Sequence, residues 1–270
     1  MDGIYILNPY KLRKFINNDI YIHKLNINKL SLNKNAINFL YKNQNLIHWN
    51  NLCKNKNSND LLKKNRDKID WSSLSLNKNA IGLLEKNQDE INWNSLSLNK
   101  NAINLIKNNL TKICWYFLST NKNAIEVLKQ NPDNIEWSIL SKNRNAIELI
   151  TSKINIDEYK INLNLLSLNK NAIEYLEKNT DKIKWRYLSK NSNAIKILEK
   201  NKDKIDWDEL SYNKNAIKLL EENQDEINWN NLSLNKNAIR ILKQNPDKID
   251  WYYISKNSSI FYKRKHNILL

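Results

Sequence analysis

Residues 91–112 read INWNSLSLNKNAINLIKNNLTK, and residues 113–134 read ICWYFLSTNKNAIEVLKQNPDN. The two stretches align without a gap at Ile, Trp, Leu-Ser and Asn-Lys-Asn-Ala-Ile, so they are copies of one 22-residue unit. A fixed period of about 20–50 residues indicates a solenoid of stacked repeats. This unit therefore decides the fold of the chain.

Tryptophans recur at the same position of the unit along the chain. They are Trp49, Trp71, Trp93, Trp115, Trp137, Trp185, Trp207, Trp229 and Trp251. Neighbouring tryptophans lie 22 residues apart, except that 48 residues, two periods plus four, separate Trp137 from Trp185. Leu163 fills the missing position and Ile27 an earlier one, because Leu-Ser follows each at the usual spacing. We therefore expect about eleven repeats, with a four-residue insertion near residues 151–160.

The repeat pattern divides the chain into three parts. Residues 1–26 lack the pattern and are expected to form an N-terminal cap. Residues 27–250 form the tandem repeat array. Residues 251–270 are expected to form a degenerate last repeat and a basic C-terminal cap, because the run KRK at 263–265 follows the last repeat residues. Atypical terminal repeats are what a solenoid needs for solubility.

Helix-start signals precede the Leu-Ser pair of the unit. In the sequence NPDNIEW, Asn131 suits a helix N-cap, Pro132 the first helical position and Asp133 the first turn. Proline at that position loses no required hydrogen bond, and the aspartate complements the helix dipole. We therefore expect a first helix over roughly residues 132–140.

A second helix is expected after the Asn-x-Asn loop, over roughly residues 146–150. The asparagine before each Ala-Ile pair suits an N-cap, and a glutamate three residues later completes a capping box in several repeats. These pairs are Asn123 and Glu126, Asn145 and Glu148, and Asn171 and Glu174. The predicted fold class is therefore all-α: an α-solenoid of about eleven repeats, each with two short antiparallel helices.

A leucine-rich repeat is the alternative, because residues 71–79, WSSLSLNKN, imitate its L-x-x-L-x-L-x-x-N pattern. The second leucine of the L-x-L pair points inward in that fold. Here the position holds Leu32, Leu76, Leu98, Leu168 and Leu234 in some repeats and Lys54, Lys142, Lys190 and Lys256 in others. Since burying a lysine is costly, the helical solenoid is favoured.

Short helices are unstable alone, so each repeat must lay its Ile, Trp, Leu and Ala side chains on its neighbour. We expect the nine tryptophans to form the structural core, as a row of indoles inside the solenoid. A platform on which bases stack is the alternative role for such a row. The paired asparagines, such as Asn99 and Asn101, are expected to serve as caps and inter-repeat hydrogen bonds.

Composition narrows the class of protein. The 270 residues include 44 Lys and Arg against 28 Asp and Glu, which gives a net charge of +16. A hydrophobic content of 41% with nine tryptophans is too high for a disordered polyelectrolyte. Two glycines and two cysteines exclude a glycine-rich phosphate loop, a disulfide framework and a cysteine-rich zinc site. The sequence shows neither a membrane-spanning run nor a signal peptide, so an intracellular location is expected.

The position between the two loop asparagines is the best candidate for a binding site. It is basic in nine of eleven repeats: Lys34, Lys56, Lys78, Lys100, Lys122, Arg144, Lys170, Lys214 and Lys236. If the repeats stack, these side chains line one edge beside the N-termini of the second helices, where unpaired amides favour anions. Phosphates of a nucleic acid or another polyanion fit this edge. The alternative is that the lysines only keep the array soluble.

The opposite edge is expected to be mixed in charge, since aspartates such as Asp67 alternate with lysines such as Lys68. Only six of the basic residues are arginines, the residue that most often reads bases. A bound nucleic acid would therefore be held through its backbone, with little sequence preference.

No catalytic, metal or cofactor site is indicated. His23, His48 and His266 lie outside any metal-ligand spacing. Cys53 occupies the serine position of its repeat and Cys114 precedes a tryptophan, so both are interpreted as structural, reduced thiols. The insertion near residues 151–160 is either a harmless bulge or a bend or docking loop.

The unit Trp-x-x-Leu-Ser-x-Asn-x-Asn-Ala-Ile, followed by Leu-x-x-Asn-x-Asp-x-Ile, covers residues 27 to about 260. It resembles the short tandem repeats of proteins encoded by giant DNA viruses of amoebae, the mimivirus relatives. Those repeats often have Asn-Pro-Asn-Ala-Ile where residues 77–81 read NKNAI. The resemblance implies an intracellular viral protein, in the host cytoplasm, the viral factory or the virion, and it supplies no catalytic residue.

The leading hypothesis from the sequence is a non-enzymatic scaffold that offers an extended surface to a protein partner. Sequence-nonspecific binding of nucleic acid or another polyanion along the lysine edge is the second hypothesis, and a structural role in the virion is a third. No cofactor and no membrane partner is expected. No motif identifies the partner or the oligomeric state.

Overall fold

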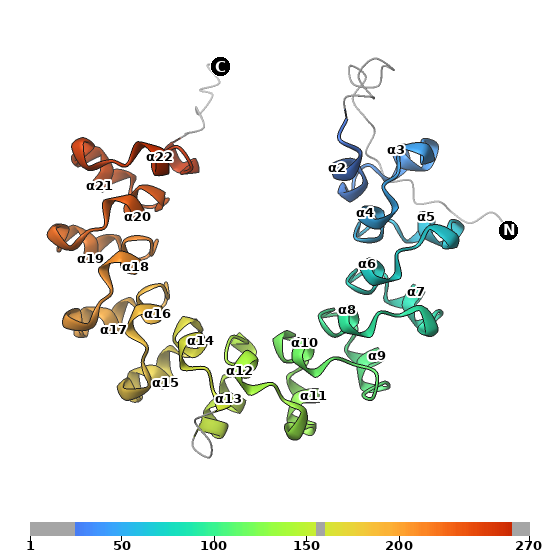
Figure 1. Cartoon of the computed structure of the whole chain (residues 1–270), viewed down its shortest axis with the longest axis horizontal. Coiled ribbons are helices and arrows are strands. Elements are labelled where there is room, and N and C mark those ends of the chain that lie inside the picture. The colour runs from blue at the N-terminus through green and yellow to red at the C-terminus, as the bar shows by residue number, and fades with distance from the viewer. Residues whose placement is uncertain (1–24, 155–159, 261–270) are drawn as a thin grey trace, which may run out of the picture. The chain divides into compact units, whose positions relative to one another are not determined.

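A computed structural model describes residues 25–154 and 160–260 of the chain. Every regular element in these two ranges is a helix, and no strand occurs in them. A helix begins at the tryptophan position of each of the eleven repeats, and ten of them are followed by a second α-helix (Figure 1). The prediction of an all-α solenoid is therefore confirmed, and the leucine-rich alternative, which needs a strand in every repeat, is wrong.

The helices that begin at the tryptophan position form the first-helix row. The chain divides into two compact units, Met1–Glu136 and Trp137–Leu270. In the first unit the row comprises α2 (Ile27–Leu32), α4 (Trp49–Cys53), α6 (Trp71–Ser75), α8 (Trp93–Ser97) and α10 (Trp115–Thr120). In the second unit it comprises α12 (Trp137–Leu140), α14 (Leu163–Leu168), α16 (Trp185–Ser189), α18 (Trp207–Ser211), α20 (Trp229–Leu234) and α22 (Trp251–Ile254). From α2 to α10 and from α14 to α22, each helix packs directly on the next one in the row.

The remaining α-helices form the second-helix row. In the first unit they are α3 (Ile37–Lys42), α5 (Asn59–Lys64), α7 (Ile81–Glu85), α9 (Ile103–Lys107) and α11 (Ile125–Gln130). In the second unit they are α13 (Ile147–Ile154), α15 (Ile173–Lys178), α17 (Ile195–Lys200), α19 (Ile217–Glu221) and α21 (Ile239–Gln244).

Short 3-10 turns connect most second helices to the next repeat. They are η1 (Gln44–Leu46), η2 (Arg66–Lys68), η3 (Gln88–Glu90), η4 (Pro132–Asn134), η7 (Thr180–Lys182), η8 (Lys202–Lys204), η9 (Gln224–Glu226) and η10 (Pro246–Lys248). Two further turns, η5 (Arg144–Ala146) and η11 (Ser258–Ile260), lie in the Asn-x-Asn region of their repeats.

The first helix of each repeat begins later than the proline signal predicts, so a continuous helix over residues 132–140 is wrong. Pro132–Asn134 form a separate turn, and Ile135 is extended, with φ −73° and ψ 125°, before α12 begins at Trp137. The residue before the tryptophan position caps the helix in most repeats. In α8, for example, Asn92 Oδ1 accepts a hydrogen bond from the backbone N–H of Ser95 at 2.9 Å. The Asn92 side chain thus provides an acceptor for one of the backbone N–H groups at the start of α8 that have no partner within the helix.

The asparagines expected as N-caps have other partners. No side-chain cap bond occurs at Asn131, whose amide donates to the carbonyl of Val127 at 2.8 Å and so closes the preceding helix. Ala124 and Ala172 are the N-cap residues of α11 and α15, without a side-chain cap bond. Asn145 lies inside η5. The proposed capping boxes are therefore wrong, because these asparagine side chains stabilise other parts of the array.

The buried core consists of leucine, isoleucine and alanine rather than tryptophan. In the repeat at 91–112, Leu96, Ala102 and Ile106 are completely buried. The tryptophans are only half-buried in the first eight tryptophan-bearing repeats, and Trp251 is 70% exposed. The prediction of a tryptophan core is wrong, because the helix turns the leucine three residues later into the stack and leaves each indole at its margin.

Two hydrogen-bond series join each first helix to the next. Ser97 Oγ donates to the Trp93 carbonyl at 2.8 Å and accepts from the backbone N–H of Cys114 in the following repeat at 3.0 Å. Nine serines accept in this way from the next repeat: Ser31, Ser75, Ser97, Ser119, Ser141, Ser167, Ser189, Ser211 and Ser233. Each of these hydroxyls is therefore buried and satisfied.

The second series is an asparagine ladder, formed by the first asparagine of the Asn-x-Asn loop. Asn99 Nδ2 donates to the carbonyls of Ser75 and Asn77 in the preceding repeat, at 2.9 and 3.2 Å. Its Oδ1 accepts from the backbone N–H of Asn101 at 3.1 Å. Equivalent bonds to the preceding serine position come from Asn55, Asn77, Asn121, Asn169, Asn191, Asn213, Asn235 and Asn257. The prediction that these asparagines join repeats is confirmed.

The four extra residues lengthen the second helix of their repeat. α13 has eight residues, whereas the other second helices have five or six. Both hydrogen-bond series continue past the insertion, because Asn162 and Asn169 still bond to Ser141. The first-helix row therefore keeps its register there. Residues 155–159 of the insertion, nearly all of the N-terminal cap and the basic C-terminal run lie outside the described residues.

Candidate functional site

The nine basic residues of the lysine edge all lie at the tip of the Asn-x-Asn loop. This edge is the set Lys34, Lys56, Lys78, Lys100, Lys122, Arg144, Lys170, Lys214 and Lys236. The loop is fixed from both sides: Asn99 closes the turn at Lys100, and Asn123 Nδ2 of the next repeat donates to the Lys100 carbonyl at 3.0 Å. The backbone is thus held while the side chain extends outward. Within each unit the basic residues therefore follow one another along one edge, as predicted.

Several lysines of this edge have no acidic neighbour. Lys56, Lys78 and Lys100 form no ion pair with any residue in the described ranges. Some basic residues elsewhere are paired, as Lys200 is with Glu177 at 2.7 Å. The positive charge at this edge is therefore left to solvent or to an anionic partner.

The second helices contribute little to anion binding at this edge. Most have only five or six residues, and in the repeat at 91–112 α9 begins at Ile103, three residues beyond Lys100. A dipole built from so few peptide units is small, and its effect falls off within a turn. Attraction of an anion would therefore come from the lysine side chains themselves.

The opposite edge is mixed in charge, as expected. Lys68 pairs with Asp67 at 3.2 Å and Lys182 with Asp181 at 3.1 Å. Other lysines of this edge cover the tryptophans: Lys112 Nζ lies 5.4 Å from the centre of the Trp93 ring, and Lys248 Nζ lies 4.9 Å from that of Trp229. These cation–π contacts cover part of the exposed ring faces of the indoles concerned.

The surface of the first-helix row is a feature that the sequence reading missed. The first and fifth positions after the tryptophan share the outer face of each first helix, because they are four residues apart. In α6 and α8 the fifth position holds Leu76 and Leu98, which are 41% and 38% exposed. Tyr116, at the first position in α10, is 48% exposed. The sequence did contain a signal for this exposed face. The fifth position varies between leucine and lysine, which indicates that it faces solvent.

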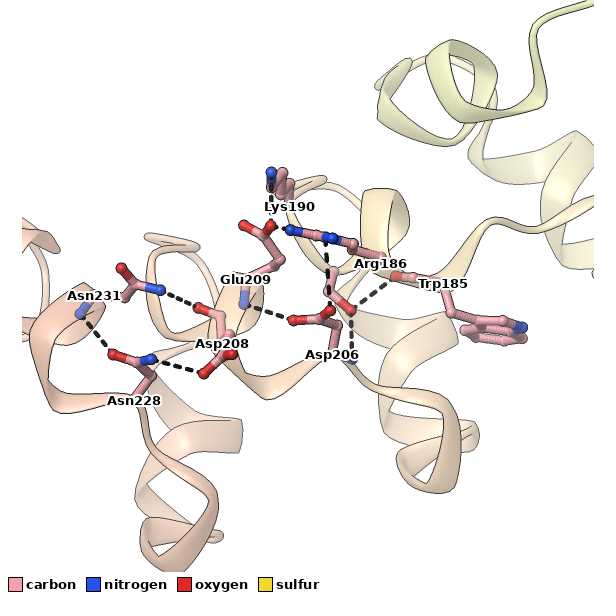
Figure 2. Close-up of polar contacts among 9 residues, drawn as sticks. Trp185, Arg186, Lys190, Asp206, Asp208, Glu209, Asn228 and Asn231 are labelled. Carbon is pink, nitrogen blue, oxygen red and sulfur yellow. Dashed lines mark hydrogen bonds and ion pairs between the residues drawn. The ribbon is translucent and has the colours of Figure 1, made fainter.

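In the second unit the same face carries a charged network (Figure 2). Arg186 Nε of α16 and Lys190 Nζ both lie close to Glu209 Oε1 of α18, at 3.2 and 2.8 Å. Asp208 accepts at its carboxylate from Asn228 Nδ2 at 2.7 Å and at its backbone carbonyl from Asn231 Nδ2 at 2.9 Å. Side chains on neighbouring first helices are therefore close enough to form one continuous surface.

Cys53 and Cys114 lie at the positions expected of structural thiols, and His48 caps a helix, a role that was not predicted from the sequence. Cys53 is buried at the serine position, and burial raises the pKa of its thiol to about 11. Cys114 is the N-cap residue of α10. His48 Nδ1 accepts from the backbone N–H of Asn51 at 3.3 Å and so caps α4. Its role is that of the asparagine or aspartate found there in other repeats.

The described ranges contain no cluster of three or more His, Cys, Asp or Glu side chains placed to hold a metal ion. None of the helices in those ranges has the length and apolar character needed to cross a bilayer. Comparison of the chain with protein-family models, with curated proteins and with solved structures finds no match.

Proposed function

We propose that this chain is a non-enzymatic repeat scaffold that holds a protein partner along its first-helix row. One observation carries the proposal: eight of the ten large hydrophobic side chains that are exposed in the described ranges lie on this row. They are Ile27, Leu32, Leu76, Leu98, Tyr116, Tyr212, Trp251 and Tyr252, and only Tyr41 and Ile260 lie elsewhere.

Such a concentration supports an interaction surface. Single exposed hydrophobic residues are normal, but several on neighbouring helices, as with Leu76, Leu98 and Tyr116 within the first unit, are typical of a binding site. Aromatic residues are also enriched at protein interfaces. The second-helix row exposes one large hydrophobic residue in the described ranges, Tyr41, and carries ion pairs such as Lys129 with Glu126 and Lys178 with Glu174. The first-helix row is therefore the better candidate for contact with a partner.

The test compares two triple variants in quantitative capture from infected amoeba cells. Replacing Leu76, Leu98 and Tyr116 with serine should abolish capture of the partner, because these changes remove the exposed anchors. The matched control replaces Tyr41, Glu85 and Lys107 of the second-helix row with serine and should retain the partner. Equal capture by the two variants would rule out the first-helix row as the binding surface.

Polyanion binding along the lysine edge is the second candidate function. The absence of acidic neighbours at Lys56, Lys78 and Lys100 favours it. Affinity for a nucleic acid should fall roughly 10³-fold between about 50 and 200 mM salt if six or more phosphates are neutralised. Binding that is flat in salt, or unchanged when Lys78, Lys100 and Lys122 become glutamine, would eliminate this candidate.

The biological setting of the proposal comes from the repeat resemblance alone. If the chain belongs with the tandem-repeat proteins of giant viruses, its partner is a viral or host protein inside an infected cell. Fractionation of infected cells into cytoplasm, viral factory and virion, followed by detection of this chain, tests the setting. Its absence from all three fractions would contradict a role in infection.

A further inference from the structure

A neutral patch lies on the first-helix row of the first unit. It consists of the first and fifth positions of α6, α8 and α10: Ser72, Leu76, Asn94, Leu98, Tyr116 and Thr120. All six side chains are exposed. In a chain with 27% charged residues, three successive first helices present no charge at these positions.

The neutral patch is continuous across the repeats. Ser72 Oγ of α6 lies 3.4 Å from Ser95 Oγ of α8, so the outer faces of these two helices touch. Tyr116 packs edge-on against Phe117, with ring centres 5.4 Å apart. In the second unit, Arg186 at the first position of α16 pairs with Glu209 at the second position of α18. The patch therefore differs from that network, because none of its six side chains is charged.

Three members of the lysine edge border the neutral patch. Lys78, Lys100 and Lys122 each follow the fifth position of a first helix by two residues. The intervening asparagines are buried in the ladder, which fixes the distance between patch and lysines. At the other end of the helices the cap residues of α8 and α10, Asn92 and Cys114, are uncharged, whereas the cap residue of α6, Asp70, is acidic. The surface is thus apolar and polar-neutral in its centre and positive along one border.

We propose that this surface binds an acidic segment of a protein chain that places an apolar side chain on each of the three helices. The proposal rests on the proposed function, since it names the chemistry of the partner. Packed helices lie about 8–10 Å apart. A polyproline II segment rises 3.1 Å per residue and repeats every three residues, so its i and i+3 side chains are about 9 Å apart. Apolar residues at every third position would then meet Leu76, Leu98 and Tyr116, while carboxylates face the lysines.

The probe is a fluorescein-labelled peptide with the sequence Leu-Pro-Glu repeated four times, titrated with the full chain by fluorescence anisotropy. Two control peptides have the same length: Ser-Pro-Glu repeats lack the apolar side chains, and Leu-Pro-Lys repeats reverse the charge. The Leu-Pro-Glu peptide should bind at least tenfold more tightly than either control. The variant with Leu76→Ser, Leu98→Ser and Tyr116→Ser should lose that tenfold preference over Ser-Pro-Glu. Thermal melts by circular dichroism should show that this variant stays folded, because the replaced side chains are exposed.

A second variant tests the charged border. Replacing Lys78, Lys100 and Lys122 with glutamine should weaken binding of the Leu-Pro-Glu peptide at least tenfold while preserving its preference over Ser-Pro-Glu. Equal affinity for the Leu-Pro-Glu and Ser-Pro-Glu peptides would overturn the proposal, as would tighter binding of a 20-nucleotide poly-thymidine that is insensitive to the leucine changes. If the peptide fails to bind but the serine triple variant still loses its captured partner, this inference fails and the scaffold function stands.

Discussion

The side-chain amide of Asn169 donates to the backbone carbonyl of Ser141 at 3.1 Å, although 28 residues separate the two in sequence. In a regular repeat the same bond spans 24 residues, as from Asn99 to Ser75. The ladder is therefore retained where the repeat is four residues longer. Part of the extra length lies in α13, which has eight residues where the other second helices have five or six. The hydrogen bonds that join the two repeats therefore persist despite the insertion.

Replacing a ladder asparagine should be strongly destabilising, both in a regular repeat and beside the insertion. Asn99→Ala removes two donors to buried carbonyls and one turn-closing acceptor, so we expect a loss of about 2–4 kcal/mol in the free energy of unfolding. Asn169→Ala should cost a similar amount, because it makes the same three bonds. Urea denaturation followed by circular dichroism measures both. If Asn169→Ala left the free energy of unfolding unchanged while Asn99→Ala lowered it, the ladder would be broken at the insertion.

The serine series predicts that Cys53→Ser is stabilising. A thiol is a weak hydrogen-bond partner, whereas the serine hydroxyl at this position bonds to the tryptophan carbonyl and to the next repeat in other repeats. We expect a gain of about 0.5–1.5 kcal/mol in the free energy of unfolding. The reverse change, Ser97→Cys, is the matched control and should cost a similar amount. A loss of stability in Cys53→Ser would contradict the role assigned to this position.

The Cys53 thiol should also resist alkylation in the folded chain. Burial raises its pKa to about 11, so the reactive thiolate is scarce at neutral pH, and the side chain is completely buried. Iodoacetamide at pH 7.5 followed by mass spectrometry should leave Cys53 unmodified, whereas unfolding in urea should expose it to complete labelling. Rapid labelling of the folded chain at Cys53 would show that the first helices separate readily at this repeat.

Asp70 should make the free energy of unfolding of the array depend on pH in the acidic range. Burial raises the pKa of Asp70, but hydrogen bonds from Ser73 and Asn50 and the nearby charge of Lys54 outweigh it and hold the pKa below its ordinary value of 3.8. A carboxyl group whose pKa is lower in the folded than in the unfolded state stabilises the folded state at pH values above its pKa in the unfolded chain. This stabilisation is lost as the pH falls through the folded pKa.

Comparing the wild type with Asp70→Asn at pH 7 and below pH 4 isolates this contribution. The amide keeps an acceptor for the Ser73 N–H, as Asn92 does in α8, but it does not titrate. The difference in stability between the two proteins should therefore shrink as the pH falls below about 4. A constant difference across this range would exclude Asp70 as a source of the acid dependence.

The period of the sequence predicts the repeat number, the lysine edge and the inter-repeat role of the asparagines, and the lysines at the second position of the L-x-L pair favour the all-helical class over a leucine-rich repeat. It does not predict where each helix begins. Pro132 and Asp133 are typical of a helix start, but the extended Ile135 ends that turn and a second start follows at Trp137. Local propensity carries no information on which carbonyl of the neighbouring repeat an asparagine will meet. The prediction that the indoles lie in the core failed for a similar reason. The size and hydrophobicity of a side chain do not show which side of a five-residue helix faces the next repeat.

Because the indoles are only half-buried, replacing a core leucine should destabilise the fold more than replacing a tryptophan. Leu96 is completely buried, so Leu96→Ala leaves a cavity and should cost about 3–5 kcal/mol. Trp93 is the larger side chain, yet it is partly exposed and covered on one side by Lys112. We expect Trp93→Ala to cost about 1–3 kcal/mol, less than full burial of an indole would give. Chemical denaturation of the two variants, monitored by circular dichroism, gives the order. If Trp93→Ala lowered the free energy of unfolding more than Leu96→Ala, the tryptophans would have to be regarded as core residues.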